Sequence, residues 1–218
     1  MILPLKDINP RRTVPFITVL LIAANVAVFV YQLTLPPHLS KAFLLSFSEI
    51  PNRLPALLAG HATWRAALLP LVTSMFLHGG LLHLAGNMLF LWVFGDNVED
   101  ALGHFRYLFF YFACGIAAGL LHIFMNLHSA LPALGASGAI SGVMGAYLIL
   151  FPRSRVLTLV FVILVPLPAV LVLGWWFVLQ FLGGMESLGM RAGGGVAWWA
   201  HVGGFLTGIV LAMGSRKS

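Results

Sequence analysis

A serine and a histidine lie inside two apolar, glycine-rich segments of this chain. Ser137 is part of LGASGAISGVMGAY, residues 134–147, and His201 is part of WWAHVGGFLTG, residues 198–208. Each lies about five residues into an apolar run that is long enough to cross a membrane. A serine activated by a histidine is the nucleophile and base pair of serine hydrolases. The two segments therefore suggest hydrolytic chemistry inside a lipid bilayer.

The composition indicates a membrane protein. Of the 218 residues, 60% are hydrophobic and 8% are charged, and the mean hydropathy is +0.98, whereas an ordinary soluble domain has about 25% charged residues. Apolar runs long enough to span a bilayer cover residues 14–35, 81–95, 105–125, 132–151, 156–182 and 196–214. We therefore expect an all-α membrane protein with six transmembrane helices, the fifth of them kinked at Pro166 and Pro168.

The connections between these runs differ in character. Residues 36–80 are too many for a structureless loop in a compact bundle, so we expect short helices there, with the apolar residues 66–78 forming a hairpin at the membrane surface. Residues 183–195, GGMESLGMRAGGG, read as a flexible connection. The domain organisation predicted is a cytoplasmic tail at 1–13, a membrane domain at 14–214 with its first loop at 36–80, and a cytoplasmic tail at 215–218.

The charges are read as topology signals. The net charge is +6, but the basic residues flank apolar runs instead of forming a stripe, which argues against nucleic acid as a partner. Eight of them fall on the side that holds both termini and four on the other side, so both termini are predicted in the cytoplasm. A short chain without added domains fits a prokaryotic plasma (inner) membrane. Cys114 is the single cysteine, which excludes an intramolecular disulfide.

Four polar residues are expected to converge on one layer of the bundle. The second, fourth and sixth spans run in the same direction, which places Asn87, Ser137 and His201 at similar depth, with His83 one turn shallower. Polar groups at that depth normally face one another or a water-filled cavity. His83 and Asn87 share one helix face and both can donate to an oxyanion at the serine. Interhelical hydrogen bonding is the structural alternative for this pair.

Small residues would allow the helices that carry Ser137 and His201 to pack closely. Ser137, Ser141 and Gly145 repeat at four-residue intervals in one segment, and Ala200, Gly204 and Gly208 do so in the other. Such stripes let two helix backbones approach closely, which would bring Ser137 within reach of His201. Helix packing without catalysis is the alternative interpretation of these stripes.

The acidic residues favour a Ser–His dyad over a triad. Four lie on the predicted cytoplasmic side, and Glu49 and Glu186 lie in outer connections, so no carboxylate is expected at the catalytic layer. His201 would then be oriented by packing, for example from Trp198. No HExxH motif is present, and we expect neither a metal nor a cofactor.

The whole pattern resembles the rhomboid intramembrane serine proteases. The matching residues, in order, are Trp64-Arg65, HLAGN at 83–87, Glu99 followed by Gly103, GASG at 135–138 and AHVGGFLTG at 200–208. The resemblance implies a six-helix rhomboid bundle with a membrane-associated first loop. It also implies Ser137 as nucleophile, His201 as general base, and His83 and Asn87 as oxyanion donors together with the Ser137 amide.

The resemblance implies a serine endopeptidase whose substrates are single-pass or polytopic membrane proteins, cut within or beside a transmembrane helix in the lipid bilayer. No obligatory partner is implied. Ser141 departs from the pattern, because some rhomboids carry an aromatic residue there. The alternative is a catalytically inactive rhomboid-like protein that binds membrane clients, although such relatives usually lack the serine or histidine. A small transporter would place its polar site at the midplane, whereas this polar layer lies toward one face.

Overall fold

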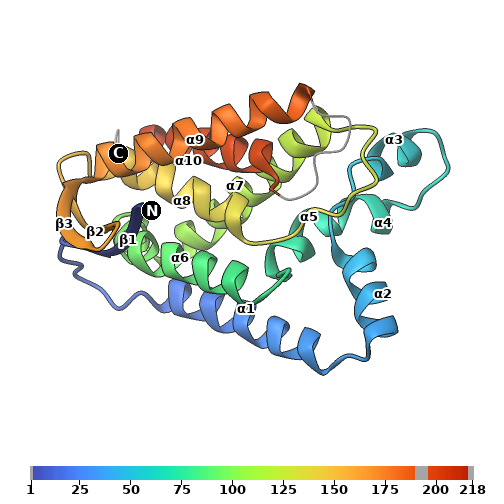
Figure 1. Cartoon of the computed structure of the whole chain (residues 1–218), viewed down its shortest axis with the longest axis horizontal. Helices are drawn as coiled ribbons and strands as arrows, with labels where there is room; N and C mark the ends of the chain where they lie inside the picture. The colour runs from blue at the N-terminus through green and yellow to red at the C-terminus, as the bar shows by residue number, and fades with distance from the viewer. Residues whose placement is uncertain (1, 190–195, 216–218) are drawn as a thin grey trace.

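A computed structural model describes residues 2–189 and 196–215 of the chain. Within these residues, long helices pack side by side and a small sheet covers one end of the bundle (Figure 1). The long helices are α1 (Phe16–Thr34), α6 (Leu81–Leu102), α7 (His104–Met125), α8 (Ser137–Leu150), α9 (Ala169–Gly189) and α10 (Trp198–Ser215). Strand β1 and the last turns of α10 lie at the same end of the molecule (Figure 1).

Helix α8 forms the centre of the bundle. Every residue from Gly138 to Tyr147 is buried, and α6, α7 and α10 pack around it. Its sequence explains the position, because glycine, alanine and serine let neighbouring backbones approach from several sides. At 14 residues it is also the shortest of the long helices in the described part of the chain.

Three of these helices, α1, α7 and α9, are by themselves long and apolar enough to cross a membrane. The segment Trp64–Phe76 together with α6 would count as a fourth, although the two parts meet at a bend of 78°. Helices α8 and α10 are apolar but shorter. The structure thus confirms a mostly helical chain with helices in the predicted regions, while the count of six spans stays a prediction.

The fifth predicted span is wrong in its first half. Residues 156–168 belong to a hairpin of strands β2 (Arg155–Val160) and β3 (Ile163–Pro168), and α9 begins only at Ala169. Proline lacks the N–H that a helix interior or a central strand needs, but an edge strand tolerates it. Because β3 is an edge strand of this sheet, Pro166 and Pro168 are accommodated within it, opposite Leu157 and Arg155 of β2, instead of kinking a helix.

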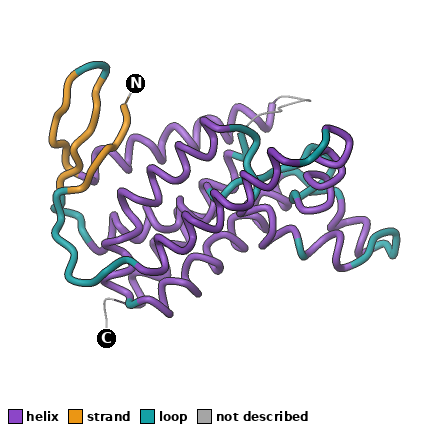
Figure 2. Tube along the Cα trace, turned by 90° about the horizontal axis from the view of Figure 1, so that it is seen from below, coloured by secondary structure: helices purple, strands orange, loops and turns teal. Residues whose placement is uncertain are grey.

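The N-terminal segment is also more ordered than the predicted tail. Residues Ile2–Asp7 form strand β1, which pairs antiparallel with β2 and places Leu3 opposite Leu159. The sheet order is β1-β2-β3, and Figure 2 shows it projecting from the end of the bundle. The fold is therefore not purely α-helical.

The long connection between α1 and α6 carries short helices. They are α2 (Pro37–Phe47), α3 (Arg53–Leu58), α4 (Trp64–Leu68), α5 (Pro70–Thr73) and the 3-10 turn η1 (Ser74–Phe76). Its association with a membrane stays a prediction. In the second connection expected to be flexible, residues 183–189 are the last turns of α9, and residues 190–195 lie outside the described part of the chain.

A buried carboxylate fixes the start of α1. Glu99 on α6 accepts hydrogen bonds from the Ile17 amide at 2.8 Å and from the Thr18 amide and hydroxyl, both at 2.7 Å. The first N–H groups of a helix have no acceptor within that helix, and the positive end of its dipole favours an anion. Glu99 therefore caps α1 from a neighbouring helix.

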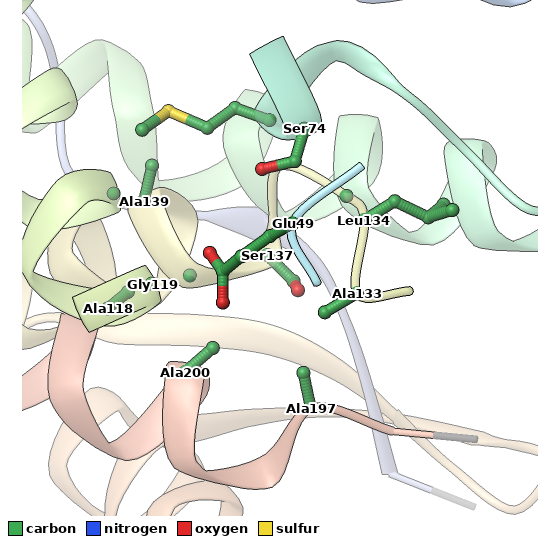
Figure 3. Close-up of a pocket in the computed structure, with 14 residues that line it drawn as sticks. Glu49, Ser74, Ala118, Gly119, Ala133, Leu134, Ser137, Ala139, Ala197 and Ala200 are labelled. Atoms are coloured by element: carbon green, nitrogen blue, oxygen red, sulfur yellow. The ribbon is translucent and has the colours of Figure 1, made fainter. Parts of the chain in front are cut away.

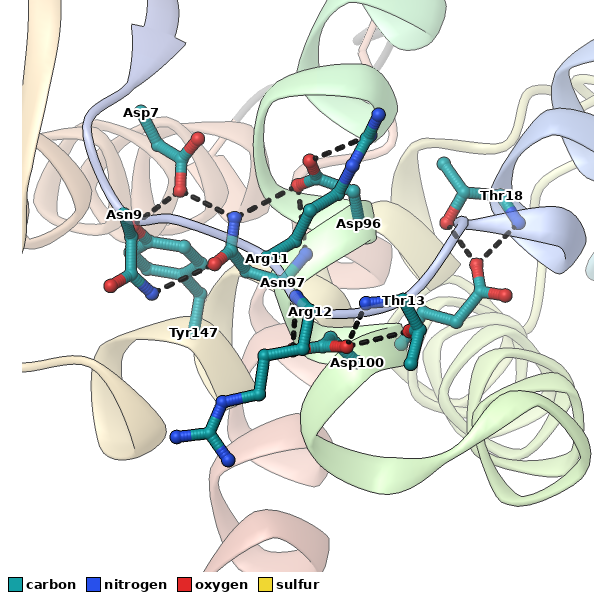
Figure 4. Close-up of polar contacts among 11 residues, drawn as sticks. Asp7, Asn9, Arg11, Arg12, Thr13, Thr18, Asp96, Asn97, Asp100 and Tyr147 are labelled. Carbon is teal, nitrogen blue, oxygen red and sulfur yellow. Dashed lines mark hydrogen bonds and ion pairs between the residues drawn. The ribbon is translucent and has the colours of Figure 1, made fainter.

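Further polar contacts join the N-terminal segment to α6 (Figure 4). Asp100 accepts from the amide and hydroxyl of Thr13 at 2.8 and 2.6 Å. Asp7 accepts from the Asn97 side chain at 2.6 Å and from the Tyr147 hydroxyl at 3.1 Å. These bonds hold β1 and α1 against the bundle at the end opposite the site described below.

We predict that Glu99→Ala lowers the free energy of unfolding by about 2–4 kcal/mol, because buried amide donors of α1 lose their acceptor. Chemical denaturation in detergent measures this change. Glu186→Ala, at an exposed position on α9, is the control and should be nearly neutral. Equal stability of the two variants would contradict the capping role of Glu99.

Candidate active site

Ser137 and His201 are in direct contact. The distance between Ser137 Oγ and His201 Nε2 is 2.7 Å. Ser137 is the first residue of α8, and His201 lies in the first turn of α10. The convergence expected from the sequence is thus present, although α8 begins at the serine itself and not several residues before it.

The orientation of His201 comes from a residue that the sequence analysis did not single out. His201 Nδ1 lies 2.7 Å from Oε1 of Gln180 on α9. An amide oxygen can only accept, so Nδ1 carries the proton and Nε2 is left to accept the Ser137 hydroxyl proton. Trp176 packs against the ring with centroids 5.8 Å apart, and Trp198, the expected packing partner, meets its edge at 6.5 Å.

Glycine contacts set the spacing of α8 and α10. A Cβ atom at Gly204 would lie 1.9 Å from the carbonyl oxygen of Gly138, and one at Gly208 would lie 1.9 Å from that of Gly142. These pairs also show that the two helices run in the same direction, as predicted. Any side chain at these positions would push the helices apart, so glycine is required for the Ser137–His201 contact.

The loop before α8 explains why the helix starts at Ser137. Gly135 has φ +124°, which excludes a helical conformation there, and its N–H donates to the Ser74 carbonyl at 2.9 Å. The first helical amides after it lack partners inside the helix, and they lie at the positive end of its dipole. Ser141, one turn later, donates its hydroxyl to the Ser137 carbonyl at 2.6 Å, whereas His201 hydrogen-bonds to Ser137 and Gln180.

His83 and Asn87 face this loop. A Cβ on Gly135 would lie 2.7 Å from His83 Nε2 and 3.5 Å from Asn87 Nδ2. His83 Nδ1 accepts from the Gly79 amide at 3.4 Å, which leaves the proton on Nε2. Asn87 Nδ2 contacts His78 Nε2 at 2.9 Å. The structure thus brings all four predicted site residues together around the loop before α8. His78 is an additional residue there, in contact with Asn87.

A small cavity opens beside Ser137 (Figure 3). Its volume is about 30 Å³, and small residues of α7, α8 and α10 form much of its wall. Glu49, from the connection between α2 and α3, lines this cavity, and the residue is 5% exposed. The prediction that no carboxylate reaches the catalytic layer is therefore wrong. The pattern of spans carries no signal for it, because a loop delivers this side chain.

The surroundings of Glu49 are unusual for an acid. Its Oε1 atom has no hydrogen-bond partner within the described residues, and burial raises the pKa of its carboxyl to about 8. No hydrogen bond links it to His201 among these residues, so the dyad expected from the sequence keeps its partners. A second cavity of about 260 Å³ lies on the other side of Ala133 and Leu134 and is lined by His83, His122 and Asn126.

Comparison with known proteins assigns the chain to a family. Residues 61–218 match the model of the Rhomboid domain. Rhomboid protein 1, mitochondrial, of Saccharomyces cerevisiae is 33% identical over 150 residues, which are 64% of this chain and 40% of that protein. Rhomboid protease GluP of Bacillus subtilis is 35% identical over 134 residues, 62% of this chain and 24% of that protein.

A longer alignment is found with the human presenilin-associated rhomboid-like protein, mitochondrial, at 28% identity over 197 residues, 87% of this chain and 45% of that protein. The chain spans less than half the length of these relatives.

The mitochondrial names of the eukaryotic relatives contradict the predicted prokaryotic plasma membrane, and that prediction is wrong. Brevity of the chain was its only basis. Since the family model covers more than half of the chain, this protein belongs to the rhomboid family.

Proposed function

We propose that this chain is an intramembrane serine endopeptidase that cleaves membrane proteins by a Ser137–His201 dyad. The observation that supports the proposal most is the line of contacts from Ser137 Oγ to His201 Nε2 and from His201 Nδ1 to Gln180 Oε1, each 2.7 Å long. A nucleophile, a base and a group that orients the base are the parts that such catalysis needs.

The reaction follows from this arrangement. Ser137 Oγ adds to the substrate carbonyl carbon while its proton passes to His201 Nε2. Collapse of the tetrahedral intermediate breaks the C–N bond, and the departing amine takes that proton. Water then adds to the acyl ester, giving its proton to His201, and ester cleavage returns a proton to Ser137 Oγ.

The negative charge of the intermediate needs hydrogen-bond donors. His83 Nε2, the Asn87 amide and the N–H groups at the start of α8 all face the loop before Ser137, and we assign them this role. Such preorganised donors stabilise the transition state because they need no rearrangement as charge develops. The positive end of the α8 dipole adds to the effect.

The proposal includes the membrane arrangement. The six long helices would span the bilayer, with the membrane domain at 14–214 and a membrane-associated first loop at 36–80. Helix α8 can be shorter than a full span because α6, α7 and α10 shield it from lipid, and the loop before α8 enters from one face. Rhomboid proteins act on membrane-protein substrates, so a transmembrane helix that unwinds locally is the expected substrate.

Labelling with a fluorophosphonate probe tests the dyad without knowledge of the substrate. We expect labelling of the purified, detergent-solubilised wild type and its loss in Ser137→Ala and His201→Ala, because the probe needs an activated serine. Ser141→Ala should keep the label, since the Ser141 hydroxyl donates to a helix carbonyl. A folded wild type that neither labels nor cleaves in membranes would favour the client-binding alternative.

Asn87→Ala should lower the rate of cleavage by roughly 10- to 1,000-fold if Asn87 is one of several oxyanion donors. The measurement is kcat/KM on any cleaved membrane substrate, compared at equal amounts of folded enzyme. An unchanged rate would leave Asn87 a packing residue that hydrogen-bonds to His78.

Gln180→Leu should slow fluorophosphonate labelling by roughly 10- to 100-fold, because His201 loses the acceptor that fixes its tautomer and orientation. Gln180→Glu keeps an oxygen acceptor and should restore most of the rate. If both variants labelled equally slowly, Gln180 would act only through packing.

A further inference from the structure

Glu49 is a buried acid that the proposed mechanism does not use. It lies in the cavity beside Ser137, and Figure 3 shows its carboxyl group close to Gly119 and Ala200, with the Ser137 side chain next to it. One of its oxygens lacks any partner among the described residues. A buried, unpaired polar atom costs folding free energy, so its position calls for a ligand that pairs with it.

Backbone hydrogen bonds fix the position of the Glu49 side chain. Glu49 and Ala133 exchange two backbone hydrogen bonds, of 3.0 and 2.7 Å, and form an isolated bridge. Ala133 lies only a few residues before the nucleophile, so the bridge ties Glu49 to the loop that carries the site. Gly119 on α7 makes room for the carboxyl group, since a Cβ there would clash with Glu49 Oε2.

The cavity is also in the right place to receive a substrate side chain. The carbonyl carbon under attack must lie next to Ser137 Oγ, and the Cα that carries the side chain of that residue is bonded directly to it. Ser137 and Gly138 themselves line the cavity. The side chain that precedes the cleaved bond is therefore within reach of Glu49.

Resting on the proposed function, we infer that Glu49 makes this site select substrates with a small hydrogen-bonding side chain, such as serine, at the residue whose carbonyl Ser137 attacks. The chemical class is set by two features of the cavity. Its volume of about 30 Å³ excludes long side chains, and the Glu49 carboxyl group together with Ser74 provides polar partners in its wall. A hydroxymethyl group meets both conditions.

The protonation of Glu49 fits this role better than recognition of a cation. Burial raises the pKa of the Glu49 carboxyl to about 8, so at neutral pH the neutral acid predominates. A neutral carboxylic acid both donates and accepts, as a hydroxyl does, and it needs no positive charge from the substrate.

The test compares two phosphonate inhibitors that differ in one group. Diphenyl phosphonate analogues of N-acylated serine and of 2-aminobutyric acid present side chains of nearly equal size, one ending in a hydroxyl and the other in a methyl. In the reaction the Ser137 Oγ–P bond forms, one phenoxide leaves, and the serine proton passes through His201 to that phenoxide. The inactivation rate is measured as loss of later fluorophosphonate labelling.

We expect wild type to react about tenfold or more faster with the serine analogue, because the aminobutyric acid analogue leaves the buried acid unpaired. Glu49→Gln keeps a donor and an acceptor and should keep the preference, whereas Glu49→Met should bring the ratio close to one. Glu49→Met should also unfold at a higher temperature without ligand, since it removes an unpaired buried group. Glu186→Met, at an exposed glutamate, is the matched control and should behave as wild type.

The outcomes separate this inference from the proposed function. A wild type that labels with fluorophosphonate but reacts equally with both inhibitors would overturn the inference alone, whatever the fold of the variants. A preference that persists in Glu49→Met would do the same. A folded wild type that reacts with no probe would overturn the proposed function and this inference with it.

Discussion

The close approach of two helix backbones, α8 and α10, is the constraint on which the rest of the structure depends. Gly204 and Gly208 meet the carbonyl oxygens of Gly138 and Gly142 at distances that leave no room for a Cβ. Hydrophobic driving force between helices is weak in lipid, so packing of this kind has to supply the association. Because the two helices are parallel and in fixed register, Ser137 and His201 come together near their beginnings. The nucleophile and base are thus held by rigid elements and not by loops.

The polar groups around this helix pair are arranged by charge. The residue that orients His201 is the neutral amide of Gln180, which avoids the large desolvation cost of an ionised partner inside the bundle. The carboxyl groups of Glu99 and Asp100 are found at the opposite end, where backbone amides and hydroxyls donate hydrogen bonds to them. Glu49 is the exception: burial raises the pKa of its carboxyl to about 8, and its Oε1 atom has no hydrogen-bond partner among the described residues.

The sequence predicted the parts of the site that depend on helix periodicity and small residues. Ser137, His201 and Asn87 could be placed at one depth because long apolar runs fix helix position, and the glycine stripes indicated which helices touch. Gln180 was missed because it lies in an apolar run that was treated as one span from residue 156 to 182. The helix that carries Gln180, α9, starts only at Ala169, and it is from this helix that the Gln180 side chain reaches His201.

The remaining errors come from contacts between segments far apart in the sequence. Nothing local to Glu49 shows that its backbone pairs with Ala133, yet that pairing brings the carboxyl group to the cavity. Likewise the hairpin at residues 155–168 is extended by β1, which pairs with β2 from the first residues of the chain. The apolar run at residues 156–182 does not itself show that a distant strand pairs with it. A helix was therefore the natural but incorrect interpretation.

The pairing of β1 with β2 also sets an order of events during synthesis. β1 is made first, but β2 begins at Arg155, so at ~5–20 residues per second the first strand waits ~7–30 s for its partner. An unpaired strand is prone to pair with other chains. Asn97 on α6 emerges much earlier and bonds to Asp7 at 2.6 Å. The polar contacts of the N-terminal segment with α6 therefore give the nascent chain a place to hold that strand until the hairpin is complete.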